Sequence, residues 1–174
     1  MIIVVDVYYT DNRAKTVGIL FRNWDDAEPL DIIAAYTDNS LEYEPGSFYK
    51  RELPCIQSLL ANGELDQLNA IIVDGYVYLS DDKKPGLGYY IYQCYDEKIP
   101  VFGVAKSAFH DNDAFVAKVY RSDSVKPLFV TSAGMELAVA AAHIQSIHGP
   151  YRFPYLLKLL DTHTKTDWEP SPVE

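Results

Sequence analysis

The segment Met1-Ile2-Ile3-Val4-Val5-Asp6-Val7-Tyr8-Tyr9 opens the chain and decides its fold. Its β-branched and other apolar residues are typical of a buried strand, but Asp6 interrupts the run. A buried, ionised carboxylate costs several kcal/mol unless a partner or a cation compensates it. The segment therefore predicts a strand from Ile2 to Tyr9 that carries a functional acid.

Two more acids stand in unusual positions. Asp74 directly follows the short apolar run Ala70 to Val73, and Glu52 lies near the start of an amphipathic helix. Neighbouring strands that each carry a buried acid would hold repelling charges, which a divalent cation relieves. We therefore interpret Asp6, Glu52 and Asp74 as ligands of Mg²⁺, with Mn²⁺ as a substitute.

Each of these acids also has a simpler interpretation. An Asp after a buried strand is more often a turn or capping residue, and Glu52 beside Lys50 and Arg51 is also typical of a solvated helix face. Lys106, which follows the apolar run Val101 to Val104, is either a loop lysine or the positive charge that a scissile phosphate needs.

The remaining apolar periodicity predicts an α/β fold with a mixed sheet. Strands are expected at Lys15–Phe21, Asp31–Thr37, Ala70–Val73, Val101–Val104, Phe115–Tyr120 and Leu128–Val130. Helices are expected over Phe48 to Leu60, with Gly63 as a stop, and at Leu87–Tyr95, Leu137–Ile147 and Phe153–Leu160. In this order the first strand can lie beside the fourth, which brings Asp6 and Asp74 together. We expect one domain over residues 1–163 and a flexible tail over 164–174.

Composition limits the classes of function. The chain has 174 residues, 48% of them hydrophobic, and no apolar stretch long enough for a membrane span. Two cysteines and no signal-peptide pattern favour a cytoplasmic protein. The net charge of −10 argues against broad electrostatic capture of nucleic acid, but leaves room for a local basic strip around Lys50, Arg51, Lys106 and Arg152. The fourteen tyrosines suit base stacking, or half-buried strands.

Ordered motifs across nearly the whole chain resemble the endonuclease V family. The motifs are Val5-Asp6-Val7-Tyr8-Tyr9, Tyr43-Glu44-Pro45-Gly46 with Arg51-Glu52, Val73-Asp74-Gly75, Leu87-Gly88, Gly103-Val104-Ala105-Lys106-Ser107, Val125-Lys126-Pro127, Ser132-Ala133-Gly134 and Tyr151-Arg152-Phe153-Pro154. Each is weak alone, and their common order carries the resemblance. It implies a ribonuclease H-like fold and a Mg²⁺-dependent endonuclease of DNA or RNA repair that cuts near inosine.

The resemblance also implies roles for individual residues. Asp6, Glu52 and Asp74 would bind the metal and, with Lys106, perform the cleavage. The loop Tyr43 to Gly46, including Pro45, would act as a wedge between strands. The substrate, single-stranded or inosine-containing, would contact Gly75, Tyr76, Leu87, Gly88, Ser107 and Gly134, with the flipped base lying against Gly75 and Leu87-Gly88.

Two positions depart from the family pattern. The family's Asp-Gly-His-Gly is Asp74-Gly75-Tyr76-Val77 here, so a glycine of the base pocket has gained a branched side chain. The family's histidine after Ser-x-Gly is Met135, at the start of a helix that we expect to face the metal. Two alternatives therefore stand beside an active nuclease: a catalytically impaired relative that binds nucleic acid, and a protein-interaction module on the same scaffold.

Overall fold

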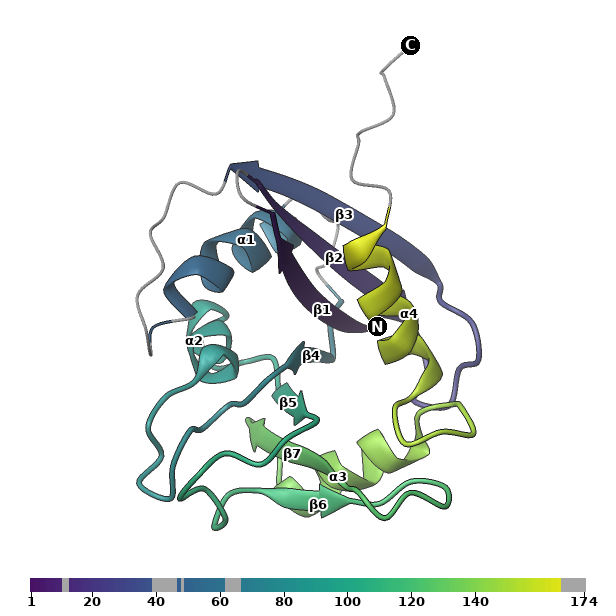
Figure 1. Ribbon diagram of the computed structural model, residues 1–174. Helices are drawn as coiled ribbons and strands as arrows, with labels where there is room; N and C mark the ends of the chain where they lie inside the picture. Colours follow the sequence, from purple (N-terminus) through teal and green to yellow (C-terminus); the bar gives the residue numbers. More distant parts are fainter. Residues whose placement is uncertain (11–12, 39–46, 48, 62–66, 167–174) are drawn as a thin grey trace.

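A seven-stranded sheet forms the centre of the structure, a computed structural model that describes residues 1–10, 13–38, 47, 49–61 and 67–166. The strands are β1 (Ile2–Tyr9), β2 (Arg13–Phe21), β3 (Asp31–Asp38), β4 (Ala70–Asp74), β5 (Val101–Ala105), β6 (Ala117–Val119) and β7 (Leu128–Ala133). The helices in these ranges are α1 (Tyr49–Ala61), α2 (Leu87–Cys94), α3 (Leu137–Ser146) and α4 (Tyr155–Lys165) (Figure 1). No helix among the described residues is long and apolar enough to cross a bilayer.

The sheet is mixed, and its strand order is β3-β2-β1-β4-β5-β7-β6. Strand β1 pairs antiparallel with β2 and parallel with β4, in a register that sets Val5 opposite Val73. The prediction that the first strand lies beside the fourth is therefore confirmed. Strands β4 and β5 are also parallel, whereas β7 runs antiparallel to β5.

Helices cover both faces of the sheet, with α1 and α2 on one and α3 and α4 on the other (Figure 1). Successive side chains of a strand point to opposite faces. In β1, Ile2 and Val4 accordingly pack toward α3 and α4, while Ile3 and Val5 pack toward α1 and α2. Continued by one step, this alternation turns Asp6 toward the face that α4 covers.

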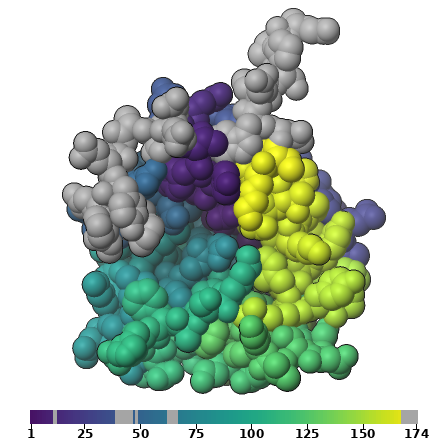
Figure 2. Space-filling view, viewed as in Figure 1, coloured from purple at the N-terminus to yellow at the C-terminus, as the bar shows by residue number. Residues whose placement is uncertain are grey.

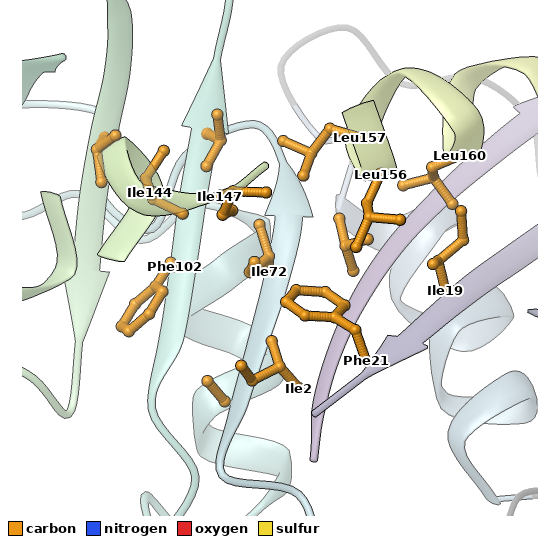
Figure 3. Packing of buried hydrophobic residues seen from close by; sticks show 14 of the residues in the cluster. Ile2, Ile19, Phe21, Ile72, Phe102, Ile144, Ile147, Leu156, Leu157 and Leu160 are labelled. Carbon is orange, nitrogen blue, oxygen red and sulfur yellow. The ribbon is translucent and has the colours of Figure 1, made fainter. Parts of the chain in front are cut away.

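The core on that face fixes α4 against the sheet. Figure 3 shows Leu156, Leu157 and Leu160 of α4 packed over Ile19 and Phe21 of β2. Leu156 and Phe21 are fully buried. Burying one such side chain stabilises the fold by about 1.5–3 kcal/mol, so this contact holds α4 against β2, the strand next to β1.

The C-terminal end of α4 is fastened by a buried lysine of β2. Lys15 is only 4% exposed, and its Nζ donates hydrogen bonds to the carbonyl oxygens of His163 (2.7 Å) and Thr166 (2.6 Å). A cation at this position satisfies carbonyls that lack helical partners and complements the negative end of the helix dipole.

Most expected elements are confirmed to within one or two residues, and the largest differences are at the ends of α4, β6 and β7. Helix α4 runs to Lys165, so the expectation that it ends at Leu160 is wrong. The expectation of a flexible tail from residue 164 is also wrong for Thr164 and Lys165, which belong to the helix. The last turn is ordered because Lys15 caps it and Thr164 is buried. Strand β6 is shorter than expected, and β7 continues to Ala133. Residues 167–174 lie outside the described part of the chain.

Candidate active site

Asp6 and Asp74 lie side by side at the same end of two parallel strands. Since Val5 is opposite Val73, the next residues on β1 and β4 are Asp6 and Asp74, on strands about 4.8 Å apart. Both line one pocket, together with Val4, Ile72, Val73, Val104, Phe153, Leu157, Leu160 and Asp161. The prediction that the topology brings these two carboxylates together is confirmed.

A third carboxylate in this pocket, Asp161, was not predicted from the sequence. It lies on α4, and its Oδ1 accepts a hydrogen bond from Lys165 Nζ at 2.7 Å, one helical turn away. In Figure 2 the purple β1 and the yellow α4 lie next to each other, with blue-green atoms from the middle of the chain set back below them. The pocket is thus built from the first strand, the central strand and the last helix.

Burial, with a smaller contribution from neighbouring carboxylates, raises the pKa of two acids in this pocket, Asp6 and Asp74. Burial, reinforced by the charge of Asp74, raises the pKa of Asp6 from 3.8 to about 6. Burial also raises the pKa of Asp74, and the charge of Asp161 adds to that shift while the charge of Lys106 opposes it. Carboxylates this close repel one another, so the binding of a divalent cation between them would be favourable.

Glu52 approaches from the opposite face of the sheet. It is the fourth residue of α1, which covers the face away from α4. Burial raises its pKa from 4.5 to about 7, and the charges of Asp6 and Asp74 contribute. Glu52 is therefore within electrostatic reach of both aspartates although it is not part of the pocket wall.

The carboxylates do not form a closed metal centre. Within the described residues, no group of three or more His, Cys, Asp or Glu side chains is close enough to hold a metal ion. The donor chemistry nevertheless fits Mg²⁺, since Asp6 and Asp74 present hard carboxylate oxygens at one pocket and Mg²⁺ commonly binds through one or two carboxylates while keeping several waters.

Lys106 brings a positive charge to the mouth of this pocket. It follows β5 directly, and its charge lowers the pKa of both Asp6 and Asp74. Its Nζ lies 4.2 Å from the ring centroid of Phe153, a residue of the pocket wall. Arg152 donates a hydrogen bond to the carbonyl of Lys106 and another, of 2.6 Å, to that of Pro127.

The expected base pocket is filled by protein atoms. The Gly88 N–H donates to the carbonyl of Tyr76 at 3.1 Å, and a Cβ placed on Gly88 would lie only 2.8 Å from Cγ2 of Val77. The Val77 side chain is fully buried, and Leu87 packs against the same core cluster. This agrees with the interpretation that a branched side chain at position 77 obstructs a purine.

The segment around Gly75 is open by comparison. Gly75 has a φ of +139°, and a Cβ added there would meet no atom within 4 Å. Its neighbour Tyr76 is buried, and the Tyr76 hydroxyl donates to the carbonyl of Ser107 at 2.6 Å. The side chain of Ser107 is exposed close to this contact.

Gly134 and Met135 lie beyond the opposite end of the central strands from Asp6 and Asp74. Strand β7 is antiparallel to β5 and ends with Ala133 opposite Val101, whereas Asp74 pairs with Val104 at the other end of β5. The expectation that Met135 faces the metal site is therefore wrong, because the direction of β7 carries the chain away from it. Met135 packs against the core instead.

The predicted wedge residues Tyr43, Pro45 and Gly46 lie outside the described residues. Of the expected basic strip, Lys106 and Arg152 are in contact, whereas the Arg51 guanidinium lies 4.4 Å from the ring centroid of Tyr9.

Asp6→Asn is expected to stabilise the metal-free protein at pH 8 by about 1–3 kcal/mol, because one pKa unit corresponds to about 1.4 kcal/mol. The pKa of Asp6 is higher in the folded than in the unfolded chain, so the stability that the carboxyl contributes is present at low pH and is lost as the pH rises from about 4 through about 6. Urea unfolding in chelator from pH 4.5 to 8 measures this.

The control for that experiment is Asp82→Asn, at an exposed position. Mg²⁺ should stabilise the wild type at pH 8 and should narrow its difference from Asp6→Asn. A stability difference that does not change with pH would contradict the raised pKa of Asp6 in the folded protein.

Comparison with known proteins gives a consistent result. The family model of endonuclease V matches residues 1–161. The fold is similar to the endonuclease V of Streptomyces avermitilis (23% identity, TM-score 0.72, covering 94% of this chain and 79% of that one) and to human endonuclease V (18%, 0.74, 94% and 82%). It is also similar to Ciona intestinalis endonuclease V in complex with inosine-containing DNA (16% identity, TM-score 0.77, covering 94% of this chain and 84% of that one). No curated protein matches. The match along residues 1–161 shows that the chain belongs to the endonuclease V family of nucleases.

Proposed function

We propose that the protein is a divalent-metal-dependent endonuclease that cleaves a phosphodiester near inosine in DNA or RNA, and so serves nucleic-acid repair. The single observation that carries the proposal is the pocket in which Asp6, Asp74 and Asp161 converge, with raised carboxyl pKa values for Asp6 and Asp74 and the charge of Lys106 acting on both. Membership of the endonuclease V family supports the reaction class.

In this proposal Asp6 and Asp74 hold Mg²⁺, with Glu52 and Asp161 near enough to act on the same site through their charges. The bound ion would supply the Lewis acidity that phosphodiester hydrolysis needs. Lys106 Nζ neutralises charge on the phosphate, and the Phe153 ring holds that ammonium in place. Asp161 Oδ1 accepts a hydrogen bond from Lys165 Nζ, which holds this carboxylate in place at the pocket.

Cleavage of matched oligonucleotides tests the proposal. Single- and double-stranded DNA and RNA, each with inosine or adenosine at one position, are incubated with Mg²⁺, Mn²⁺ or chelator. We expect one cut close to inosine that chelator abolishes. Binding without cleavage in either metal would favour the second candidate, a catalytically impaired relative. One observation supports that candidate: the described residues contain no group of three ligands close enough to hold a metal ion.

Val77→Gly is expected to raise the preference for inosine over adenosine by about 10-fold, which is the usual effect of opening a pocket by one or a few methyl groups. The Val77 side chain occupies the space against Gly88, so its removal makes room for a base edge. The measurement is the ratio of kcat/KM on the two oligonucleotides.

Val101→Ala is the matched control, since it also shortens a buried valine of the same core cluster but lies outside the pocket wall, at the end of β5 away from Asp74. Both variants lose about 1–3 kcal/mol or more of stability, so activity is compared at a temperature where both are folded. An equal change of preference in the two variants would contradict a specific role of Val77.

A further inference from the structure

A row of cationic and aromatic side chains leads away from the active-site pocket along the start of α4. The row, here called the α4 strip, consists of Lys106, Tyr151 and Lys158. Lys106 Nζ lies 4.2 Å from the centroid of the Phe153 ring in the pocket wall, and Lys158 Nζ lies 5.7 Å from that of Tyr151. The strip thus begins at the pocket and continues outward.

The strip is exposed but firmly seated. The side chains of Lys106 and Lys158 are exposed, and Tyr151 is 66% exposed, the largest exposure among the aromatic residues of the described part of the chain. Arg152, between Tyr151 and Phe153, donates hydrogen bonds to the carbonyl oxygens of Lys106 and Pro127. The guanidinium therefore fixes the backbone that carries the strip to the segments after β5 and before β7.

The position of Lys158 relates the strip to the chemistry. It precedes Asp161 by three residues on α4, about one helical turn, and Leu157 beside it lines the pocket. Lys158 is therefore on the helix that forms one wall of the pocket, beside a residue of that wall.

The chemistry of the strip selects its partner. In a chain with a net charge of −10, exposed ammonium groups at the pocket complement phosphates. An exposed tyrosine ring offers a stacking platform to a base, which is available only where the base is not already stacked in a duplex. Lysines alone would fit any polyanion, so Tyr151 distinguishes the partner.

We propose that the α4 strip binds the single-stranded part of the nucleic acid next to the cleaved bond, with Lys158 on a phosphate and Tyr151 stacked on a base. This inference rests on the proposed function, because it places the same substrate. It assigns to Tyr151 and Lys158 a role in binding and none in the cleavage step.

Binding is measured in chelator, so that no substrate is cut, with a fluorescent 12-nucleotide single strand and with the same sequence as a duplex. Tyr151→Ala should weaken single-strand binding by about 10-fold, within the usual range for one base stacked on an aromatic ring. Tyr151→Phe should bind like the wild type because it keeps the ring. Lys158→Gln should lower the slope of log K against log salt by about 0.7.

Two controls match these variants. Tyr155→Ala removes a second exposed tyrosine, the first residue of α4, whose ring lies against His148 instead. Lys98→Gln removes an exposed lysine that pairs with Asp96 before β5, at the opposite edge of the sheet. Neither should change binding or the salt slope.

The outcomes separate the two proposals. Unchanged binding in Tyr151→Ala, or an equal loss on single strand and duplex, would overturn the stacking role of the strip. An unchanged salt slope in Lys158→Gln would overturn its phosphate contact. Wild-type protein that binds through the strip but never cuts in Mg²⁺ or Mn²⁺ would refute the proposed nuclease while leaving the strip in place.

Discussion

Asp74→Asn is expected to lower the cleavage rate by at least about 10³-fold while the protein stays folded, because several kcal/mol of charge stabilisation depend on an anionic metal ligand. The amide keeps the shape of the side chain but loses its charge. It also relieves the repulsion that raises the pKa of Asp6, so the variant should be at least as stable as the wild type without metal. Single-turnover cleavage and thermal unfolding measure the two effects.

Asp82→Asn, in the exposed segment after β4, is the matched control and should cleave normally. Cleavage within tenfold of wild type by a folded Asp74→Asn protein would place the chemistry outside the pocket of Asp6 and Asp161.

Asp161→Asn is expected to lower cleavage by about 10²-fold, the lower end of what a positioned acidic or basic group contributes. Its carboxylate lines the pocket and shifts the pKa of both Asp6 and Asp74, so its charge acts on the same site. Rates measured at several Mg²⁺ concentrations show whether the loss lies in metal affinity or in turnover at saturation.

Lys165→Gln separates this role from a structural one. It breaks the ion pair of Lys165 with Asp161 but leaves the carboxylate in the pocket. If Asp161 serves only to stabilise α4, the two variants should lose the same stability and neither should lose cleavage. That result would contradict the assigned role.

The sheet could be predicted because its signals are local. The apolar residues of β1 and β4 form short runs, and the alternating order of elements then favours the parallel pairing of the two strands. Asp6 is conspicuous in such a run. Its convergence with Asp74 therefore follows from strand pattern and topology alone.

Asp161 gave no comparable signal. With Lys165 four residues later it resembles an ordinary solvated ion pair on a helix surface, and the periodicity suggested that the helix had already ended. What makes Asp161 part of the site is the packing of α4 over β1 and the cap from Lys15, a residue 148 positions away from His163. No local pattern reports a contact of that range.

The expectation that Met135 faces the metal site was wrong for a related reason. A motif in the expected order along the chain does not fix the direction of the strand that carries it. Strand β7 runs antiparallel to β5, so Gly134 and Met135 follow it at the end of the strands away from Asp74. The side chain of Val77, in contrast, could be evaluated from sequence because it adds bulk beside a glycine that must be approached closely.

The pocket joins β1 to α4, elements close to the two ends of the described chain. During synthesis on the ribosome, Asp6 and Asp74 emerge long before Asp161. Lys15 can donate its hydrogen bonds to the carbonyl oxygens of His163 and Thr166 only after these residues have been made. A nascent chain therefore carries two exposed aspartates without the helix that encloses them. The proposed active site is complete only when α4 docks, so we expect no cleavage before translation has passed that helix.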